Sequence, residues 1–340
     1  MSQQSKAPTL GDVARLSGVS QSTVSRVING IPGVRPEVVQ KVQSAVSQLR
    51  YTPNRAARSL VTSRTDTLAL IVPESTSQFF QDPFIAAVVD AAVSAVEDTR
   101  YTLQMIVVGT PAIDKTRSYL QRGSVDGLLV VSHHDPVWRS LSSLAERLPT
   151  VLVGRPLHSA PPGVSIIDVD NISGGREATE HLISLGRTRI GHISGPFDMS
   201  AGVDRARGWR AALEEAGLRA DLLEPADYTD RGARVAMRQL LEREPALDGV
   251  FVSSDLMAVA ALDILQELGR DVPGDVAMIG FDGTDLTLST TPRLSTVDQR
   301  PREIGSAMID VAIRRVEGRA DADGLHAMPT TLVVRESSSV

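Results

Sequence analysis

Short apolar runs alternate with helical stretches from Thr67 to the end of the 340-residue chain. Eight runs have the pattern of buried strands, namely 68–72, 103–108, 127–131, 150–153, 165–169, 189–193, 249–253 and 276–280. A helix is expected over 85–98. Strands separated by helices predict parallel sheets in a doubly wound α/β fold, and such sheets bind ligands at the carboxyl ends of their strands.

The length predicts two or three folding units, because a single core seldom grows to 340 residues. The chain has no run of eighteen apolar residues, and its N-terminus lacks the apolar segment of a secretory signal. Cysteine is absent, which excludes disulfides and thiolate metal sites. We therefore expect a cytoplasmic protein without a membrane partner.

The charge is divided unevenly along the chain. Residues 1–64 carry nine Lys and Arg but only two acids, whereas the whole chain has a net charge of -6. The first 64 residues therefore have a charge of +7 and the rest -13. A basic head on an acidic body suits phosphate contact at one end only, although a solvated basic surface is equally consistent with charge alone.

The basic head has the pattern of two short helices separated at Gly18. Thr9 followed by Asp12 is typical of a capping box, and Val24, Val27 and Ile28 form an inward-facing stripe on the second helix. The opposite face of that helix carries Gln21, Ser22, Ser25, Arg26 and Asn29. Such polar side chains are what base readout in a major groove requires. A small helical bundle without a DNA role is the alternative.

A third helix is predicted to start at Pro36, and the short segment Asn54–Leu60 follows it. That segment is too short for a stable isolated helix, so it would order only against DNA or a partner copy. Leu60 would then be an apolar wedge that opens a base step. The alternative is a linker that contains one incidental leucine.

The chain resembles the lactose-repressor (LacI/GalR) family of bacterial transcription regulators. DVARLSGVSQSTVSRVING and YTPNRAARSLVTSRT are similar to the family's DNA-binding signature. The likeness continues, in the family's order, through 168–196, 255–282, 291–299 and 332–337. It implies a small all-α helix-turn-helix headpiece and a hinge helix, followed by an α/β two-subdomain body similar to a periplasmic sugar-binding protein.

The resemblance also implies the domain boundaries. A helix-turn-helix domain would cover 1–52, a hinge helix and linker 53–66, and a ligand-binding and dimerisation body 67–340. The N-subdomain of the body would comprise about 67–168 and 298–328, and the C-subdomain about 169–297 and 329–340. The chain would cross between them near 168, 298 and 329.

The DNA-binding residues follow from the same likeness. Gln21 and Ser22 would face bases, and Arg26 would contact a base edge or a phosphate. The full set is Thr9, Gln21, Ser22, Thr23, Ser25, Arg26, Asn29, Asn54, Ala57 and Leu60. Thr9 and Asn29 would contact the DNA backbone, and Ala57 and Leu60 the minor groove. The family usually has Ser or Thr where Arg35 precedes Pro36, so the cap of the third helix is expected to be weaker or Arg35 to add a phosphate contact.

Several polar residues follow predicted strands and suggest a ligand site. Asp170, Arg205, Asp255 and Asp282 could together hold a polyol, although each alone is more typical of a cap or a surface charge. The resemblance implies ligand contacts by Phe84, Asp170, Arg205, Tyr228, Ser254, Asp282 and Gln299. Purine-binding members have Arg and Thr where this chain has Met199 and Ala201, which favours a sugar or related polyol.

No enzyme signature accompanies these features. His133-His134-Asp135 is more typical of a loop than of a metal site, since no further ligand is evident. Gly191–Gly195 lacks the spacing of a nucleophile elbow, and no phosphate-binding glycine motif is present. Gly174-Gly175 favours close helix packing. We therefore expect neither an enzyme, nor a cofactor, nor a metal.

The resulting hypothesis is a homodimeric, ligand-responsive transcription regulator, most simply a repressor. Its partners would be double-stranded DNA with a pseudo-palindromic operator and a small-molecule effector, and it would associate with the nucleoid through DNA. A terminal heptad-rich extension is absent, which favours a dimer over a coiled-coil tetramer. The alternative is a sugar-binding receptor module of transport or chemotaxis, against which the basic head and the missing signal argue.

Substitution Leu60→Ala tests the wedge hypothesis. We expect it to reduce affinity for a specific palindromic duplex far more than affinity for random DNA, because only specific binding would need the opened base step. Fluorescence anisotropy with both duplexes measures the two losses. Equal losses would refute the wedge role.

Overall fold

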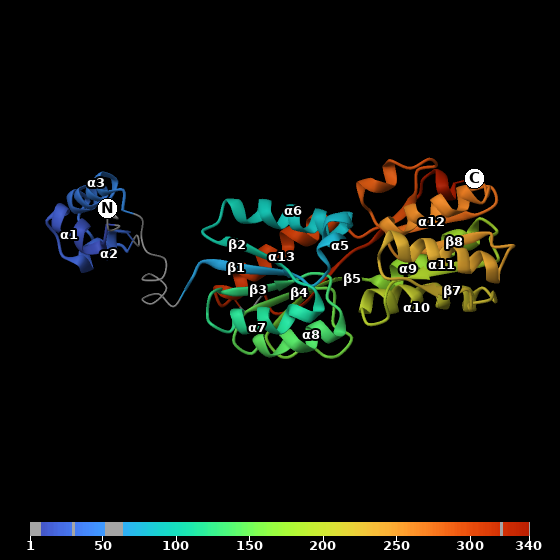
Figure 1. Ribbon diagram of the computed structural model, residues 1–340, viewed down its shortest axis with the longest axis horizontal. Helices are drawn as coiled ribbons and strands as arrows, with labels where there is room; N and C mark the ends of the chain where they lie inside the picture. Colours follow the sequence, from blue (N-terminus) through green and yellow to red (C-terminus); the bar gives the residue numbers. More distant parts are fainter. Residues whose placement is uncertain (1–7, 29–30, 52–63, 320–321, 340) are drawn as a thin grey trace, which may run out of the picture. The chain divides into compact units, whose positions relative to one another are not determined.

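A computed structural model of the chain describes residues 8–28, 31–51, 64–319 and 322–339. The chain forms two compact units, 1–65 and 66–340 (Figure 1). Asn29, Asn54, Ala57 and Leu60, and with them most of the expected hinge helix, lie outside the described residues.

The described residues of the first unit form the helices α1 (Leu10–Ser17), α2 (Gln21–Ile28) and α3 (Pro36–Leu49). The predicted capping box is confirmed, because the backbone N–H of Thr9 donates to Asp12 Oδ2 at 2.9 Å and that of Asp12 donates to Thr9 Oγ1 at 3.3 Å. α1 ends at Gly18, whose φ of 70° favours glycine. The core of the first unit is formed by Val13, Ala14, Val24, Val42 and Ala45. Arg35 makes no side-chain hydrogen bond at the start of α3.

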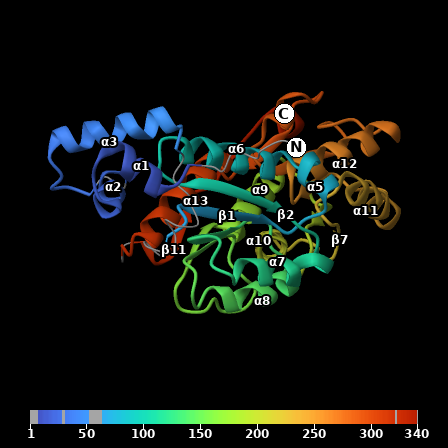
Figure 2. The same ribbon diagram turned by 60° about the vertical axis from the view of Figure 1, so that its left-hand side comes forward.

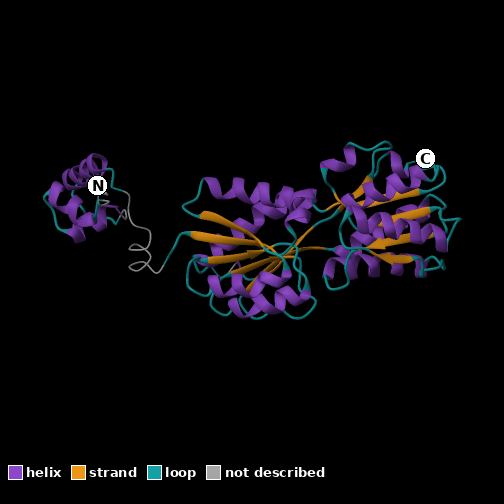
Figure 3. Cartoon of the chain, viewed as in Figure 1, coloured by secondary structure: helices purple, strands orange, loops and turns teal. Residues whose placement is uncertain are grey.

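The second unit contains two six-stranded sheets covered on both faces by helices, as Figures 1 and 3 show. The first sheet is entirely parallel and has the order β11-β5-β4-β3-β1-β2. Its strands are β1 (Thr67–Val72), β2 (Thr102–Val107), β3 (Gly127–Val130), β4 (Thr150–Val153), β5 (Val164–Val169) and β11 (Gly324–Met328). Helices α6 (Pro83–Glu97) and α13 (Pro301–Val316) pack together on one face, and α7 (Ile113–Leu120) and α8 (Asp135–Leu141) cover the other (Figures 1 and 2).

The second sheet has the order β12-β10-β9-β8-β6-β7, and only the β10–β12 pair is antiparallel. Its strands are β6 (Ile190–Ser194), β7 (Leu223–Pro225), β8 (Gly249–Val252), β9 (Ala277–Asp282), β10 (Ser295–Asp298) and β12 (Thr331–Val333). Helices α9 (Asn171–Ser184) and α10 (Ser200–Glu215) cover one face, and α11 (Asp230–Arg243) and α12 (Asp255–Glu267) the other.

Shorter helical elements join these layers: α5 (Thr76–Gln81), η1 (Thr110–Ala112), η2 (Ser142–Leu144), η3 (Asp285–Leu288) and η5 (Glu336–Ser338). The chain passes between the sheets at three points, after β5, after β10 and after β11. The doubly wound α/β class is confirmed. β7, β10, β11 and β12 were not among the expected strands. β7, β11 and β12 are edge strands with partly exposed side chains, and β10 (STVD) contains a single apolar residue, so none of them has the apolar pattern of a buried strand. No helix of the described ranges is long and apolar enough to cross a membrane.

The predicted packing role of Gly174-Gly175 is confirmed. A Cβ on Gly175 would lie 2.5 Å from the carbonyl oxygen of Arg205, and a Cβ on Gly174 would lie 2.9 Å from Cε2 of Phe281. α9 therefore approaches α10 so closely that only hydrogen fits at the contact. Because Arg205 lies at this contact, the packing also fixes the position of α10 beside the strand ends.

Substitution Gly175→Ala should therefore lower the free energy of unfolding by about 1–3 kcal/mol, because the added methyl group overpacks the α9–α10 contact. Urea denaturation measures the change. Glu177→Ala on the exposed side of α9 is the matched control, with an expected change within about 0.5 kcal/mol. A Gly175→Ala protein as stable as the control would contradict the close contact.

Candidate functional site

The exposed side of α2 gathers the polar residues predicted for nucleic-acid contact. Gln21, Ser22 and Arg26 are exposed, while Thr23 and Ser25 are half-buried. Ser20 Oγ lies 2.8 Å from Ser22 Oγ and accepts the backbone N–H of Thr23 at 3.2 Å, so it caps the helix. The helix is held by buried Val24 on its other side. The polar start of α2 is thus presented on a fixed scaffold.

Thr9 and Arg26 already have protein partners in this structure. Thr9 Oγ1 donates to Asp12 Oδ2 at 2.7 Å, and this hydrogen bond lowers the pKa of the Asp12 carboxyl. Arg26 Nη2 donates to the carbonyl of Pro32 at 3.0 Å. Its guanidinium is nevertheless exposed at the end of α2, where it can exchange that carbonyl for a phosphate or a base edge.

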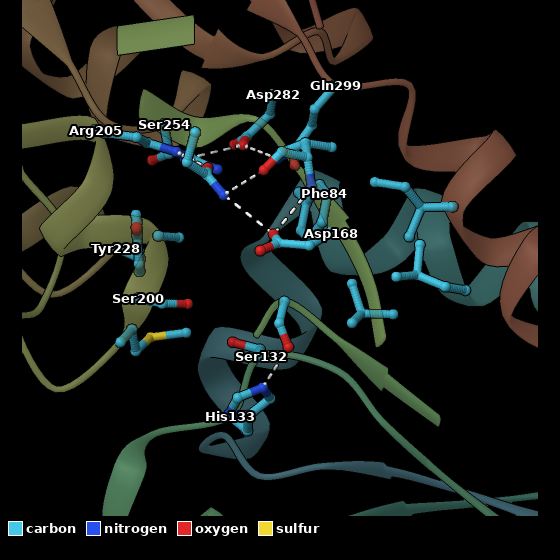
Figure 4. A pocket seen from close by; sticks show the side chains of 18 of the residues that line it. Phe84, Ser132, His133, Asp168, Ser200, Arg205, Tyr228, Ser254, Asp282 and Gln299 are labelled. Carbon is cyan, nitrogen blue, oxygen red and sulfur yellow. Dashed lines mark hydrogen bonds and ion pairs between the residues drawn. The ribbon is translucent and has the colours of Figure 1, made fainter. Parts of the chain in front are cut away.

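A cavity lies in the second unit, where residues that follow strands of both sheets converge (Figure 4). Six of the seven predicted ligand residues line it: Phe84, Arg205, Tyr228, Ser254, Asp282 and Gln299. The seventh, Asp170, is not among the lining residues. Its carboxylate instead caps α9 by accepting the backbone N–H of Ser173 at 2.9 Å and the Ser173 hydroxyl at 2.7 Å.

Arg205 of α10 is the centre of one cavity wall and is buried. Its Nε donates to Asn171 Oδ1 at 2.8 Å, and its Nη1 donates to the carbonyl of Ser253 at 2.5 Å. Nη1 also lies 3.6 Å from Asp282 Oδ1, and the guanidinium carbon lies 3.6 Å from the ring centre of Phe281. These contacts fix the guanidinium by hydrogen bonds, charge and stacking together.

Asp282, the last residue of β9, faces the same space. Gln299 Nε2 donates to its Oδ1 at 2.6 Å, and the backbone N–H of Asp255 lies 3.4 Å from its Oδ2. Burial raises the pKa of Asp282 well above its ordinary value, against the opposing effect of Arg205. Ser254 caps α12 through Met257 N at 3.2 Å, so Asp255 is not the cap.

Asp255 instead anchors the loop beyond β9. Its Oδ2 accepts the backbone N–H of Thr284 at 2.8 Å, and its Oδ1 accepts the hydroxyl of Thr296 at 2.6 Å. Burial raises the pKa of Asp255 to about 7.

Tyr228 has a φ of 58° and is buried, with its hydroxyl against Gly195. That hydroxyl has no hydrogen-bond partner among the described residues. Burial raises the pKa of Tyr228 to about 12, so the phenol stays protonated at neutral pH. A glycine at 195 is required because any side chain there would occupy the space of the ring.

Other lining residues were not predicted: Asp82, Ser132, His133, Asp168, Asn171, Met199, Ser200 and Ala201. The sequence singles out Met199 and Ala201 only because purine-binding members of the family have Arg and Thr at these positions. Asp82 had a usable signal, because an Asp before Pro83 is typical of a helix cap. Asp168 lies within β5, whereas Asp170 follows the end of the strand at Val169 and caps α9. Residues two apart in a strand share a face, so the alternation of side chains could not separate these two aspartates.

Both histidines of His133-His134-Asp135 have protein partners. His133 Nε2 lies 2.9 Å from the carbonyl of Gly154, and burial lowers the pKa of His133. His134 Nδ1 lies 2.9 Å from Asp198 Oδ1, and its Nε2 lies 3.5 Å from Glu74 Oε1. Within the described ranges, no group of three His, Asp or Glu side chains is placed to hold a metal ion.

The His134–Asp198 pair belongs to a set of contacts between the two sheets' subdomains. The backbone N–H of Asp135 donates to the carbonyl of Asp198 at 2.9 Å, and Ser200 Oγ donates to the carbonyl of Arg155 at 2.5 Å. Arg155 also forms an ion pair with buried Asp204. We name His134–Asp198, Asp135–Asp198, Ser200–Arg155 and Arg155–Asp204 the cross-cleft contacts. They hold one arrangement of the two subdomains around the cavity.

Comparison with known proteins supports both units. The model of bacterial regulatory proteins of the lacI family matches residues 9–54, and a periplasmic binding protein-like domain matches 179–338. The HTH-type transcriptional regulator CelR of Thermobifida fusca is 41% identical over 338 residues, 98% of each chain. The ribose operon repressor of Escherichia coli K12 is 36% identical over 318 residues, 91% of this chain and 93% of the relative.

Two solved structures show the same arrangement of elements. A transcriptional regulator CelR–cellobiose complex is 39% identical, with a TM-score of 0.76, and the match covers 97% of this chain and 99% of the other. The lac repressor dimer bound to operator and the anti-inducer ONPF has a TM-score of 0.85 at 24% identity, with coverage of 98% and 100%. The second likeness establishes the fold alone.

The His134 contacts predict a pH dependence of stability. Glu74 and then Asp198 raise the pKa of His134 to about 9, so folding favours the protonated ring. The stabilisation is complete below the unfolded pKa near 6.5 and is lost as the pH rises through about 9. Thermal denaturation should therefore show that the stability gap between wild type and His134→Gln closes between these values. A gap that widens with rising pH would contradict the ion pairs.

Proposed function

The chain belongs to the lacI family of bacterial regulatory proteins, and we propose that it is a repressor whose operator binding is controlled by a saccharide bound in the cavity. Family membership also decides between the two functions considered from the sequence, in favour of a regulator over a transport or chemotaxis receptor. The effector role is supported by a cavity lined by fixed hydrogen-bonding groups. The same chain also presents polar residues on the exposed face of α2.

The saccharide assignment rests on the cavity and on the relatives. Arg205, Asp282, Gln299 and Asn171 supply donors and acceptors that suit hydroxyl groups, and Tyr228 and Phe84 supply aromatic surface. One relative is named a ribose operon repressor, and one similar structure contains cellobiose. Met199 and Ala201 line the cavity where purine-binding members would carry polar side chains, which argues against a nucleobase.

The proposed control acts through the two subdomains. A ligand that contacts both walls favours one relation between them, and it shifts the DNA equilibrium only by its difference in affinity for the two states. Couplings of this kind are typically about 1–3 kcal/mol. The cross-cleft contacts would stabilise one of these states before the ligand arrives, and the segment 53–66 would transmit the change to the headpiece.

The remaining partners are part of the same proposal. A homodimer would place two α2 helices on the half-sites of a pseudo-palindromic operator, since twofold protein symmetry matches such a sequence. The similar lac repressor structure is a dimer on operator DNA. The proposed location is the bacterial cytoplasm, with association to the nucleoid through DNA.

Substitution Arg205→Lys tests the effector site. Lysine keeps the positive charge beside Asp282 but cannot reproduce the guanidinium's simultaneous bonds to Asn171 and Ser253. We expect the protein to bind a palindromic duplex, selected from a randomised pool, with unchanged affinity and to lose its response to sugars. Exposed Arg210→Lys on the same helix is the control. A full response in Arg205→Lys would refute the assignment of the cavity.

A further inference from the structure

The cavity has an excess of carboxylates over cations. Asp82, Asp168 and Asp282 line it, whereas Arg205 is its one cationic residue within the described chain. His133 also lines it, but burial lowers the pKa of His133, so the ring is neutral at pH 7. An incoming ligand therefore meets three acidic side chains and a single guanidinium.

That guanidinium is already occupied by the protein. Asp282, Asn171, the carbonyl of Ser253 and the face of Phe281 surround Arg205. Two other basic residues of the cross-cleft contacts are similarly engaged, since Arg155 pairs with Asp204 and His134 with Asp198. A phosphate or carboxylate on the ligand would find no uncommitted positive charge in the wall.

Asp82 and Asp168 each offer an acceptor to the cavity. Asp82 Oδ1 accepts the backbone N–H groups of Phe84 at 2.9 Å and Ile85 at 3.3 Å, and no described residue donates to its Oδ2. Asp168 Oδ1 accepts from Val169 N and Asn171 Nδ2, and its Oδ2 lies 3.7 Å from Nε of Arg155, whose backbone N–H also hydrogen-bonds to this carboxylate. Oδ2 of Asp82 is thus available to a hydroxyl donor, and Asp168 keeps further lone pairs for one beside Arg155.

The two walls also influence each other electrostatically. Burial raises the pKa of Asp282, and the charges of Asp255 and then Asp82 raise it further. Burial also raises the pKa of Asp82 to about 6. Figure 4 shows Asp168, Asp282 and Arg205 facing the same space. A ligand anion placed there would add like charge to a poorly solvated acidic site, where such repulsion is screened much less than in water.

We infer that the cavity selects an uncharged saccharide and rejects phosphorylated or carboxylated sugars, with Asp82 and Asp168 as specificity-determining residues. This rests on the proposed function and narrows it to a class of effector. The two carboxylates accept hydrogen bonds from ligand hydroxyl groups and repel anions.

Calorimetric titration of the intact protein with matched ligands tests the inference. The pairs are D-glucose with glucose 6-phosphate and glucuronate, D-ribose with ribose 5-phosphate, and cellobiose with cellobionate. We expect the uncharged member of any pair that binds to be preferred by about tenfold or more. An anionic member that binds as tightly as its neutral partner, and that alters DNA affinity, overturns the inference but leaves a sugar-responsive regulator intact.

Asp82→Asn and Asp168→Asn separate charge from shape. An amide oxygen still accepts backbone hydrogen bonds, so each variant removes the charge while keeping the acceptor. We expect each variant to lower the ratio of the affinity for the neutral ligand to the affinity for its anionic partner by about threefold or more. Asp248→Asn is the matched control, because Asp248 also accepts two backbone N–H groups, from Thr188 and Arg189, but does not line the cavity.

Equal melting temperatures among the variants and the control show that each remains folded. If the neutral-to-anionic affinity ratio stays at the wild-type value in both Asp82→Asn and Asp168→Asn, the role of these two residues in specificity is overturned. If neither member of any pair binds the wild-type protein, the proposed saccharide effector itself fails, and the inference fails with it.

Discussion

The buried pair of Arg205 and Asp282 is the constraint on which the cavity depends. Removing two charges from water is costly unless they are paired and their remaining groups are hydrogen-bonded. Asn171, Ser253 and Gln299 meet that requirement. Asn171 follows β5 of the first sheet, whereas Ser253 and Gln299 follow β8 and β10 of the second. The pair therefore holds several strand ends in register, and the glycine contact between α9 and α10 places Arg205 among them.

This arrangement connects packing to regulation. Because the protein already neutralises Arg205, the guanidinium serves as a fixed hydrogen-bonding element, and ligand recognition passes to the carboxylates and hydroxyl groups around it. Two of the cross-cleft contacts, His134–Asp198 and Arg155–Asp204, join side chains that do not line the cavity. Substitutions in these two contacts can therefore change subdomain closure without changing the residues that line the cavity. Ligand binding and closure are coupled, but they depend on different side chains.

Much of the fold and part of the cavity could be predicted from the sequence. Long apolar runs such as 68–72 identify central strands, but β7 and β12 have only three residues each and gain their structure from neighbouring strands. Arg205 and Asp282 were predicted through family motifs. Asp82 was missed because its cap role and its cavity role coincide. Asp170 was chosen in place of Asp168 because the sequence does not show that β5 ends at Val169 and that Asp170 caps α9. Leu60 and the hinge segment lie outside the described residues and stay predictions.

The most direct test is the affinity of the intact wild-type protein for its saccharide, measured with and without a saturating amount of its operator duplex. Binding linkage requires the two affinities to differ by the factor by which saturating saccharide changes DNA affinity, typically about 5–150-fold. Matching factors of this size would establish that the cavity and the headpiece report on one shared equilibrium. The same saccharide affinity in the free and DNA-bound states would contradict effector control.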